Sequence, residues 1–145
     1  MSRQKPIALF ADQGLLIVLR RLLACAAPAE GCALLLGTAE AGGWRLLRIW
    51  PCCNVWPEAG ARDRRFAVDP REQLVAQRWG RQRGLQVLGV AHSHPAAAAE
   101  PSERDCALCV PPALLVIAGI DGDLRGWWLE SAEDAPQPLP WRMED

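Results

Sequence analysis

The chain contains two histidines, His92 and His94, and both lie in the segment Ala91-His92-Ser93-His94-Pro95. Ser102 and Asp105 follow shortly after them. Two imidazoles and one carboxylate are three side chains of metal-ligand type, and a set of three protein ligands is typical of catalytic zinc sites, which keep a fourth position for water. The pattern therefore predicts a hydrolytic zinc site whose ligands are His92, His94 and Asp105.

Local structure explains why this spacing suits a metal. Residues 86–91 are mostly apolar and partly β-branched, which predicts a buried strand that leads directly into His92. Side chains at positions i and i+2 of a strand leave the same face, so His92 and His94 point together. Ser102 is typical of a helix N-cap, and Asp105 then falls in the first helical turn, from which its carboxylate can point back toward the histidines.

The full arrangement, His-x-His-Pro-x6-Ser-x-x-Asp, resembles the signature of the JAMM, or MPN-plus, zinc metalloproteases, and it matches at every fixed position. The segment from Glu30 through Cys32 to Gly37 resembles the Glu-x-Cys strand of the same family. Asn54 and the segment 66–70 are weaker similarities. Together they cover roughly residues 7 to 130.

The resemblance implies a role for each residue. One Zn²⁺ per chain would be held by His92, His94 and Asp105, and zinc lowers the pKa of a coordinated water toward ~7. Glu30 would take a proton from the attacking water and deliver it to the leaving amine. Ser102 would help to hold the oxyanion. The expected reaction is hydrolysis of a peptide or isopeptide bond.

The resemblance also implies the fold, an α/β class domain in which helices flank a single mixed, curved β-sheet, with layers similar to those of cytidine deaminases. We expect this metalloprotease domain to occupy residues 1–132. Residues 133–145, which are acidic and contain proline, are expected to form a loosely ordered tail.

Family members act on ubiquitin and ubiquitin-like proteins, and the compact bacterial type resembles enzymes that process sulfur carriers at a C-terminal glycine. Only residues 106–113 separate Asp105 from the next expected strand, which points to the compact type. We therefore expect a ubiquitin-like or sulfur-carrier protein as substrate. The segment Trp56–Arg65, rich in charge, is expected to be a flap beside the cleft. The extended tail of the carrier is expected to add to an exposed strand edge by backbone pairing.

Several other interpretations stay open. Ser102 would cap its helix whether or not it takes part in catalysis, and Glu30 would be a solvated carboxylate if the resemblance were ignored. The domain would be a non-catalytic MPN-type scaffold if it only bound partners. Cys106 and Cys109 raise the possibility of a zinc deaminase, although His92-Ser93-His94 lacks the glutamate of the His-x-Glu element that deaminases need.

Composition limits the class of protein. The chain has 145 residues, half of them hydrophobic, which is enough for one core. Its 16 basic and 17 acidic residues give no nucleic-acid footprint. The apolar stretch from Gly14 to Leu19 is too short to span a membrane, and the N-terminus lacks the pattern of a secretory signal. We expect a cytoplasmic protein with reduced cysteines and no membrane partner.

The remaining periodicity predicts helices at 12–26 and from Asp69 to near Gly84. It also predicts strands at 30–36, 44–50, 114–119 and 124–130.

Overall fold

A computed structural model describes residues 3–144 of the chain. Its elements are, in order, β1 (Leu9–Asp12), α1 (Gln13–Ala24), β2 (Cys32–Glu40), β3 (Gly43–Cys52), a 3-10 turn (Ala59–Ala61), α2 (Pro70–Arg81), β4 (Gln86–Ser93), α3 (Glu103–Leu108), β5 (Ala113–Ala118), β6 (Leu124–Leu129), β7 (Gln137–Leu139) and β8 (Trp141–Glu144). Within these residues every helix is too short or too polar to cross a bilayer.

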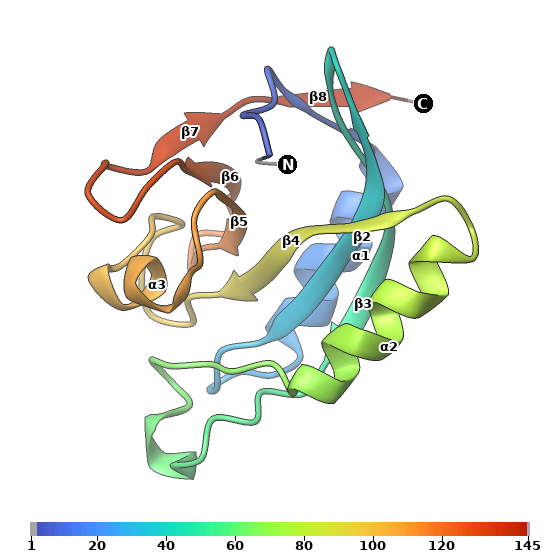
Figure 1. Ribbon diagram of the computed structural model, residues 1–145. Coiled ribbons are helices and arrows are strands. Elements are labelled where there is room, and N and C mark those ends of the chain that lie inside the picture. The colour runs from blue at the N-terminus through green and yellow to red at the C-terminus, as the bar shows by residue number, and fades with distance from the viewer. Residues whose placement is uncertain (1–2, 145) are drawn as a thin grey trace.

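The eight strands form one mixed sheet in the order β7-β6-β5-β4-β2-β3-β1-β8. The two outermost strands, β7 and β8, are separated in sequence only by Pro140, whose carbonyl accepts a hydrogen bond from the Leu9 amide at 2.9 Å. The sheet therefore curls around so that its two edges approach one another, as Figure 1 shows. Strand β4 lies in the middle, antiparallel to β2 and parallel to β5.

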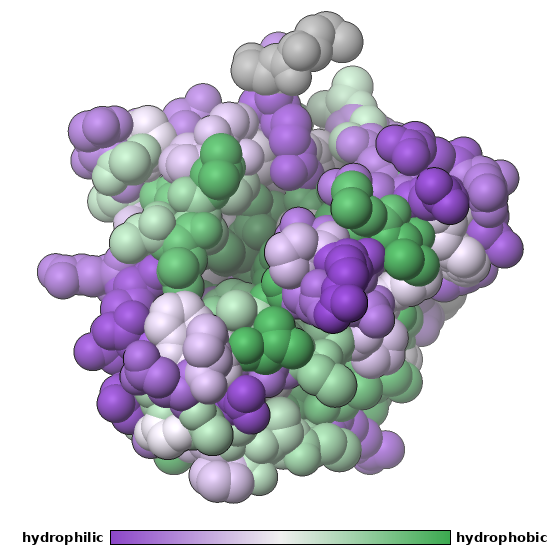
Figure 2. Space-filling view, turned by 60° about the horizontal axis from the view of Figure 1, so that its bottom comes forward, coloured by the Kyte–Doolittle hydropathy of each residue, from purple (hydrophilic) through white to green (hydrophobic). Residues whose placement is uncertain are grey.

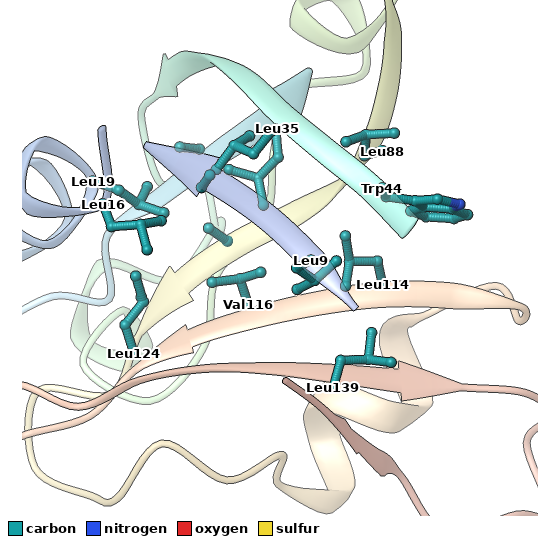
Figure 3. Close-up of a cluster of buried hydrophobic side chains, with 14 of the residues drawn as sticks. Leu9, Leu16, Leu19, Leu35, Trp44, Leu88, Leu114, Val116, Leu124 and Leu139 are labelled. Carbon is teal, nitrogen blue, oxygen red and sulfur yellow. The ribbon is translucent and has the colours of Figure 1, made fainter. Parts of the chain in front are cut away.

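Helix α1 lies against the inner side of this curved sheet. Asp12 caps it by accepting a hydrogen bond from the Leu15 amide, and Leu16, Leu19 and Leu23 are its buried residues. These leucines pack against inward side chains of the strands, which Figure 3 shows converging from several strands. Burial of such leucines contributes roughly 1.5–3 kcal/mol each, so this cluster holds α1 against the sheet.

Helix α2 covers the opposite side. Strand β2 alternates between the two cores, because Ala33 and Leu35 join the inner cluster while Leu34 and Leu36 pack with Ala76 of α2 in a second cluster. This alternation is the period of two that a strand buried on both faces requires. Packing on both faces thereby holds β2 and its neighbour β4 in place. The start of β2 at Cys32 lies beside the end of β4 at His92.

The expected fold class is confirmed, and so are the helices and strands expected around the motifs. The strands β1, β7 and β8 were missed, and the expectation of a loosely ordered tail is wrong. Residues 137–144 form two strands of the main sheet, with β7 pairing to β6 and β8 pairing in parallel to β1. Pairing and packing, including the buried Leu139, order a segment whose composition alone favours disorder.

Candidate metal centre

The candidate centre forms where β2 and β4 lie side by side. Cys32 pairs with His92, and the Ser93 amide donates to the Gly31 carbonyl at 3.0 Å. The Ser93 side chain leaves the opposite face of β4 from the two histidines, and its hydroxyl accepts a hydrogen bond from the Gly31 amide at 2.8 Å. A Cβ on Gly31 would lie 2.4 Å from the Leu23 carbonyl oxygen, so this crossing requires glycine. These contacts hold Glu30 and the two histidines at one end of the sheet.

Helix α3 brings the third side chain. The Ser102 hydroxyl accepts from the Asp105 amide at 3.0 Å, and the Ser102 amide donates to Oδ2 of Asp105 at 2.9 Å, which makes a reciprocal capping box. The same carboxylate reaches the histidines, since its Oδ1 lies 3.2 Å from Nε2 of His92 and its Oδ2 lies 3.0 Å from Nε2 of His94. The cap therefore orients Asp105 toward β4.

Within residues 3–144, His92, His94 and Asp105 form a buried group of the kind that holds a metal ion. The Nε2 atoms of the two histidines lie 3.1 Å apart. Tetrahedral zinc with bonds of about 2.0–2.1 Å separates its ligand atoms by about 3.3 Å, close to the spacing of all three atoms. The residues present thus fit a metal ion, because three electron-pair donors face one point.

The two histidines are supported differently. Nδ1 of His94 donates to the Ala98 carbonyl at 2.8 Å, which leaves Nε2 free to ligate. Nδ1 of His92 is buried without a hydrogen-bond partner in the described chain, and the ring is stacked on Phe66 with the centroids 4.5 Å apart. The Ala98 contact could not be predicted from the residue types, because any residue can supply a carbonyl.

The charges of the site follow from these contacts. Burial lowers the pKa of His92. Burial also acts to lower the pKa of His94, but hydrogen bonds to Asp105 and to the Ala98 carbonyl raise it overall. Burial acts to raise the pKa of Asp105, yet the hydrogen bonds with both histidines hold it well below its usual range. Asp105 is therefore an anion at neutral pH, as a metal ligand must be.

Glu30 is a second buried carboxylate, with 5 % of its surface exposed. Its Oε1 is buried and has no hydrogen-bond partner in the described chain. Burial raises the pKa of Glu30 to about 7, and the charges of His94 and Asp105 are near enough to affect it. The interpretation of Glu30 as a solvated carboxylate is wrong, and its pKa suits a group that exchanges protons near neutral pH.

The backbone of Glu30 is held by the flap, residues 56–65. The Glu30 amide donates to the Arg62 carbonyl at 2.6 Å. The Asn54 side-chain amide donates to the Glu30 carbonyl at 3.0 Å and to the Arg65 carbonyl at 2.9 Å. Oδ1 of Asn54 accepts from the amides of Trp56 and Ala67. Asn54 is thus the link between the flap and Glu30, a role that its weak family similarity did not reveal.

A groove of about 620 Å³ leads to His92 and Asp105. Its floor comes from β4 and β5, one wall from Trp56, residues 66–68 and α2, and the other wall from residues 108–112. Figure 2 shows a hollow bordered by hydrophobic residues on this face of the molecule. The flap lies beside the groove, which Trp56 lines, and it contains the 3-10 turn Ala59–Ala61.

Cys106 and Cys109 stand outside the metal-ligand group found within residues 3–144. Burial raises the pKa of Cys106, and it raises that of Cys109 to about 11. A thiol binds zinc as the thiolate, so the raised pKa values speak against a ligand role for these cysteines.

Comparison with known proteins identifies the family. Residues 12–130 match the family described as prokaryotic homologs of the JAB domain. The chain belongs to this JAB family. The resemblance to JAMM proteins is thereby confirmed.

Two curated relatives extend the comparison. The chain is 34 % identical over 128 residues to a probable TtuB-protein conjugate cleaving protease of Thermus thermophilus, covering 88 % of this chain and 80 % of the relative. It is also 34 % identical over 83 residues to the tail tip assembly protein K of Escherichia phage N15, covering 56 % of this chain but only 31 % of the phage protein. Membership in the JAB family and the protease relative together support a peptidase or isopeptidase role.

Solved structures agree on the fold. Protein DSY2949 of Desulfitobacterium hafniense matches with a TM-score of 0.83 at 25 % identity, covering 94 % of this chain and 93 % of that one. AF2198, a JAB1/MPN domain protein of Archaeoglobus fulgidus, matches with a TM-score of 0.58 at 18 % identity. The match covers 96 % of this chain and 100 % of that one. The second likeness speaks for the fold alone.

Proposed function

We propose that this protein is a zinc-dependent peptidase or isopeptidase that cleaves after the C-terminal glycine of a ubiquitin-like or sulfur-carrier protein. The observation that carries the proposal is the convergence of His92, His94 and Asp105, the first and last of which line the groove, near the buried Glu30. The name of the Thermus thermophilus relative, which refers to TtuB conjugates, supports the substrate class.

His92, His94 and Asp105 would hold the ion in the proposed enzyme. Bound zinc supplies Lewis acidity, which activates water and polarises a carbonyl. Glu30 accepts the proton of the attacking water on its carboxylate and gives it to the nitrogen of the leaving amine. Burial raises the pKa of Glu30, which helps this one group to perform both transfers.

Ser102 has a structural and a catalytic role in this proposal. Its hydroxyl oxygen accepts from the Asp105 amide, and the hydroxyl proton stays available for another acceptor. That proton donates to the oxygen of the scissile carbonyl as negative charge develops on it. Capping and catalysis thus use different atoms of one hydroxyl group.

The groove accepts the carrier tail. The floor from Val87 to His92 is roughly 17 Å long, because a strand rises ~3.3 Å per residue, and this matches about five residues of extended chain. The lining is mostly apolar, with Arg3 and with Gln73 and Gln77 of α2 among the polar groups. A tail of low charge fits such a surface, and the amides of the two glutamines can bond to its backbone.

The test uses purified protein supplied with Zn²⁺ and TtuB fused through its C-terminal glycine to a second polypeptide. We expect cleavage directly after the glycine, measured by mass spectrometry, and loss of cleavage when a chelator removes the metal. Glu30→Gln should lower the cleavage rate about 10²–10⁴-fold while the variant still binds about one zinc per chain. Glu58→Gln, which removes an exposed carboxylate of the flap, is the matched control and should cleave normally.

Zinc retained by the wild type, with no cleavage of TtuB fusions or of any other ubiquitin-like fusion, would contradict the proposal and favour the scaffold interpretation. Zinc that is bound equally by wild type and His94→Ala would contradict the assignment of the ligands.

A further inference from the structure

The groove carries a positive charge away from the proposed metal site. Arg3 is the only arginine or lysine among the described residues that line the groove. It comes from the segment before β1, and its Nη2 donates a hydrogen bond to the Leu88 carbonyl of β4. Its Cζ also lies 4.6 Å from the centre of the Trp44 ring, and Figure 3 shows Trp44 and Leu88 at the same end of the inner cluster. These two contacts hold the guanidinium in place.

The Leu88 carbonyl is available because Leu88 is left out of both neighbouring ladders. The register of β4 with β2 shifts here, so that the paired residues of β4 pass from Val87 directly to Gly89. The ladder between β4 and β5 begins one residue later, at Gly89. Leu88 is buried, and a buried carbonyl outside the ladders requires another donor. Arg3 supplies that donor, so an irregularity of the sheet fixes the position of the charge.

The guanidinium of Arg3 lacks an anionic partner within residues 3–144, because the ion pairs found there involve other residues. The side chain is half-buried, and burial lowers its pKa. Arginine nevertheless keeps its charge at neutral pH. A guanidinium has five N–H donors, and the Leu88 carbonyl occupies one of them. A cation partly withdrawn from water without a counter-ion favours an anionic ligand.

The position of Arg3 determines which residue of a bound tail it contacts. Leu88 precedes His92 by four residues along β4, and a strand rises ~3.3 Å per residue, so the two lie roughly 13 Å apart. An extended tail in the groove rises by the same amount per residue. When the C-terminal glycine lies beside His92, the fourth residue before that glycine therefore lies near Arg3.

We infer that Arg3 is a specificity-determining residue, which binds an acidic side chain on the fourth residue before the C-terminal glycine of the carrier. The inference rests on the proposed function and adds the tail sequence that the groove selects. Arginine forms strong charge-assisted hydrogen bonds with a carboxylate. A basic side chain at the same position of the tail places two like charges together. The mostly apolar lining between Arg3 and His92 accepts the uncharged residues that follow.

The test uses zinc-loaded protein and TtuB fused through its C-terminal glycine to a second polypeptide, with Glu, Gln or Lys as the fourth residue before that glycine. We expect kcat/KM for the glutamate fusion to exceed that for the glutamine fusion by about 10-fold, as for one charge-assisted hydrogen bond. The lysine fusion should be cleaved most slowly. Glutamate placed two residues before the glycine, about 7 Å farther from Arg3, should give no gain over glutamine at that position.

Variants of Arg3 separate charge recognition from a structural role. Arg3→Gln should cleave the glutamate and glutamine fusions equally, and Arg3→Glu should prefer the lysine fusion. Arg48→Gln, which removes an exposed arginine of β3 outside the groove, is the matched control and should keep the wild-type preference. If the Arg3 variants slowed all fusions by the same factor, Arg3 would only hold Leu88 and the inference would fail. If they do not fold, the wild-type comparison of the fusions decides.

A binding measurement separates this inference from the proposed function. Zinc-loaded Glu30→Gln should bind the glutamate fusion about 10-fold more tightly than the glutamine fusion, and E30Q/R3Q should bind both equally. Equal cleavage of these two fusions by the wild type would overturn the inference and leave the peptidase proposal standing. If no fusion is cleaved, the proposed function fails, and the binding preference alone decides whether Arg3 recognises an acidic tail.

Discussion

Glu30 and Asp105 are carboxylates of similar burial, 5 % and 6 % exposed, yet their pKa values shift in opposite directions. Asp105 lies at the start of α3 and receives hydrogen bonds from the Ser102 amide and from the histidines, so its pKa is far below its usual range. Glu30 lies before β2, its Oε1 has no partner in the described chain, and burial raises its pKa to about 7. Burial alone does not decide the role of a carboxylate; the donors around it do.

The largest effects are expected when each of the two carboxylates is replaced separately by its neutral amide. Asp105→Asn should lower zinc affinity at least about 100-fold, because a charged ligand is lost. Glu30→Gln should retain zinc and lower kcat about 10²–10⁴-fold, as expected for the loss of a general base. Zinc competition with a chelator and steady-state kinetics measure the two effects. Loss of zinc in Glu30→Gln would remove the distinction between the two carboxylates.

Ser102 tests whether the hydroxyl that accepts from the Asp105 amide also acts in catalysis. Glycine keeps most of the capping free energy, within a few tenths of a kcal/mol, but has no hydroxyl. Ser102→Gly should therefore lower kcat about 10²–10³-fold with little change in thermal stability, and Ser102→Thr should stay active. If Ser102→Gly remains fully active, the hydroxyl serves only as a cap.

Asn54 tests whether the position of Glu30 depends on the flap. Asn54→Asp keeps an acceptor for the Trp56 and Ala67 amides but replaces the donor to the Glu30 carbonyl. We expect kcat to fall about 10- to 100-fold, as for a misplaced catalytic group, with zinc affinity unchanged.

The double variant E30Q/N54D separates this positioning role from a general one. If Asn54 acts through Glu30, adding Asn54→Asp to Glu30→Gln should reduce the residual rate no further. Multiplicative losses in the double variant would instead show an independent, merely structural contribution of Asn54.

The smallest expected effect is on the stability of the metal-free protein. Because the folded-state pKa of Glu30 is about 7, above its ordinary value of 4.5, its contribution to stability is fully present below pH 4.5 and is lost as pH rises through 7. The loss is on the order of 1–3 kcal/mol. Glu30→Gln should thus be more stable than wild type at pH 8 and similar at pH 4.5, by thermal unfolding with chelator present. An equal difference at both pH values would contradict the raised pKa.

Much of the candidate site was predictable because its geometry is local. The period of a strand places His92 and His94 on one face, and a helix cap places Asp105 in the first turn. The link from Asn54 to Glu30 was not predictable, since it joins a side chain to carbonyls that every residue has. The strands β7 and β8 were also missed, because their order comes from pairing with β6 and β1 across the closing sheet.

The sequence by itself determined the residue types, their spacing and the family, and hence the metal-ligand group that the structure brings together. Only the tertiary structure decided the electrostatics. The fold buries Oε1 of Glu30 without a hydrogen-bond donor, whereas it surrounds the Asp105 carboxylate with several donors. It also attaches the backbone of Glu30 to the flap through Asn54. Arg3 comes to line the groove, and Arg20 and Arg21 come to line a second pocket. Side-chain identity sets which charges a residue can carry, and the donors, acceptors and water that the fold places around it set which charge it keeps.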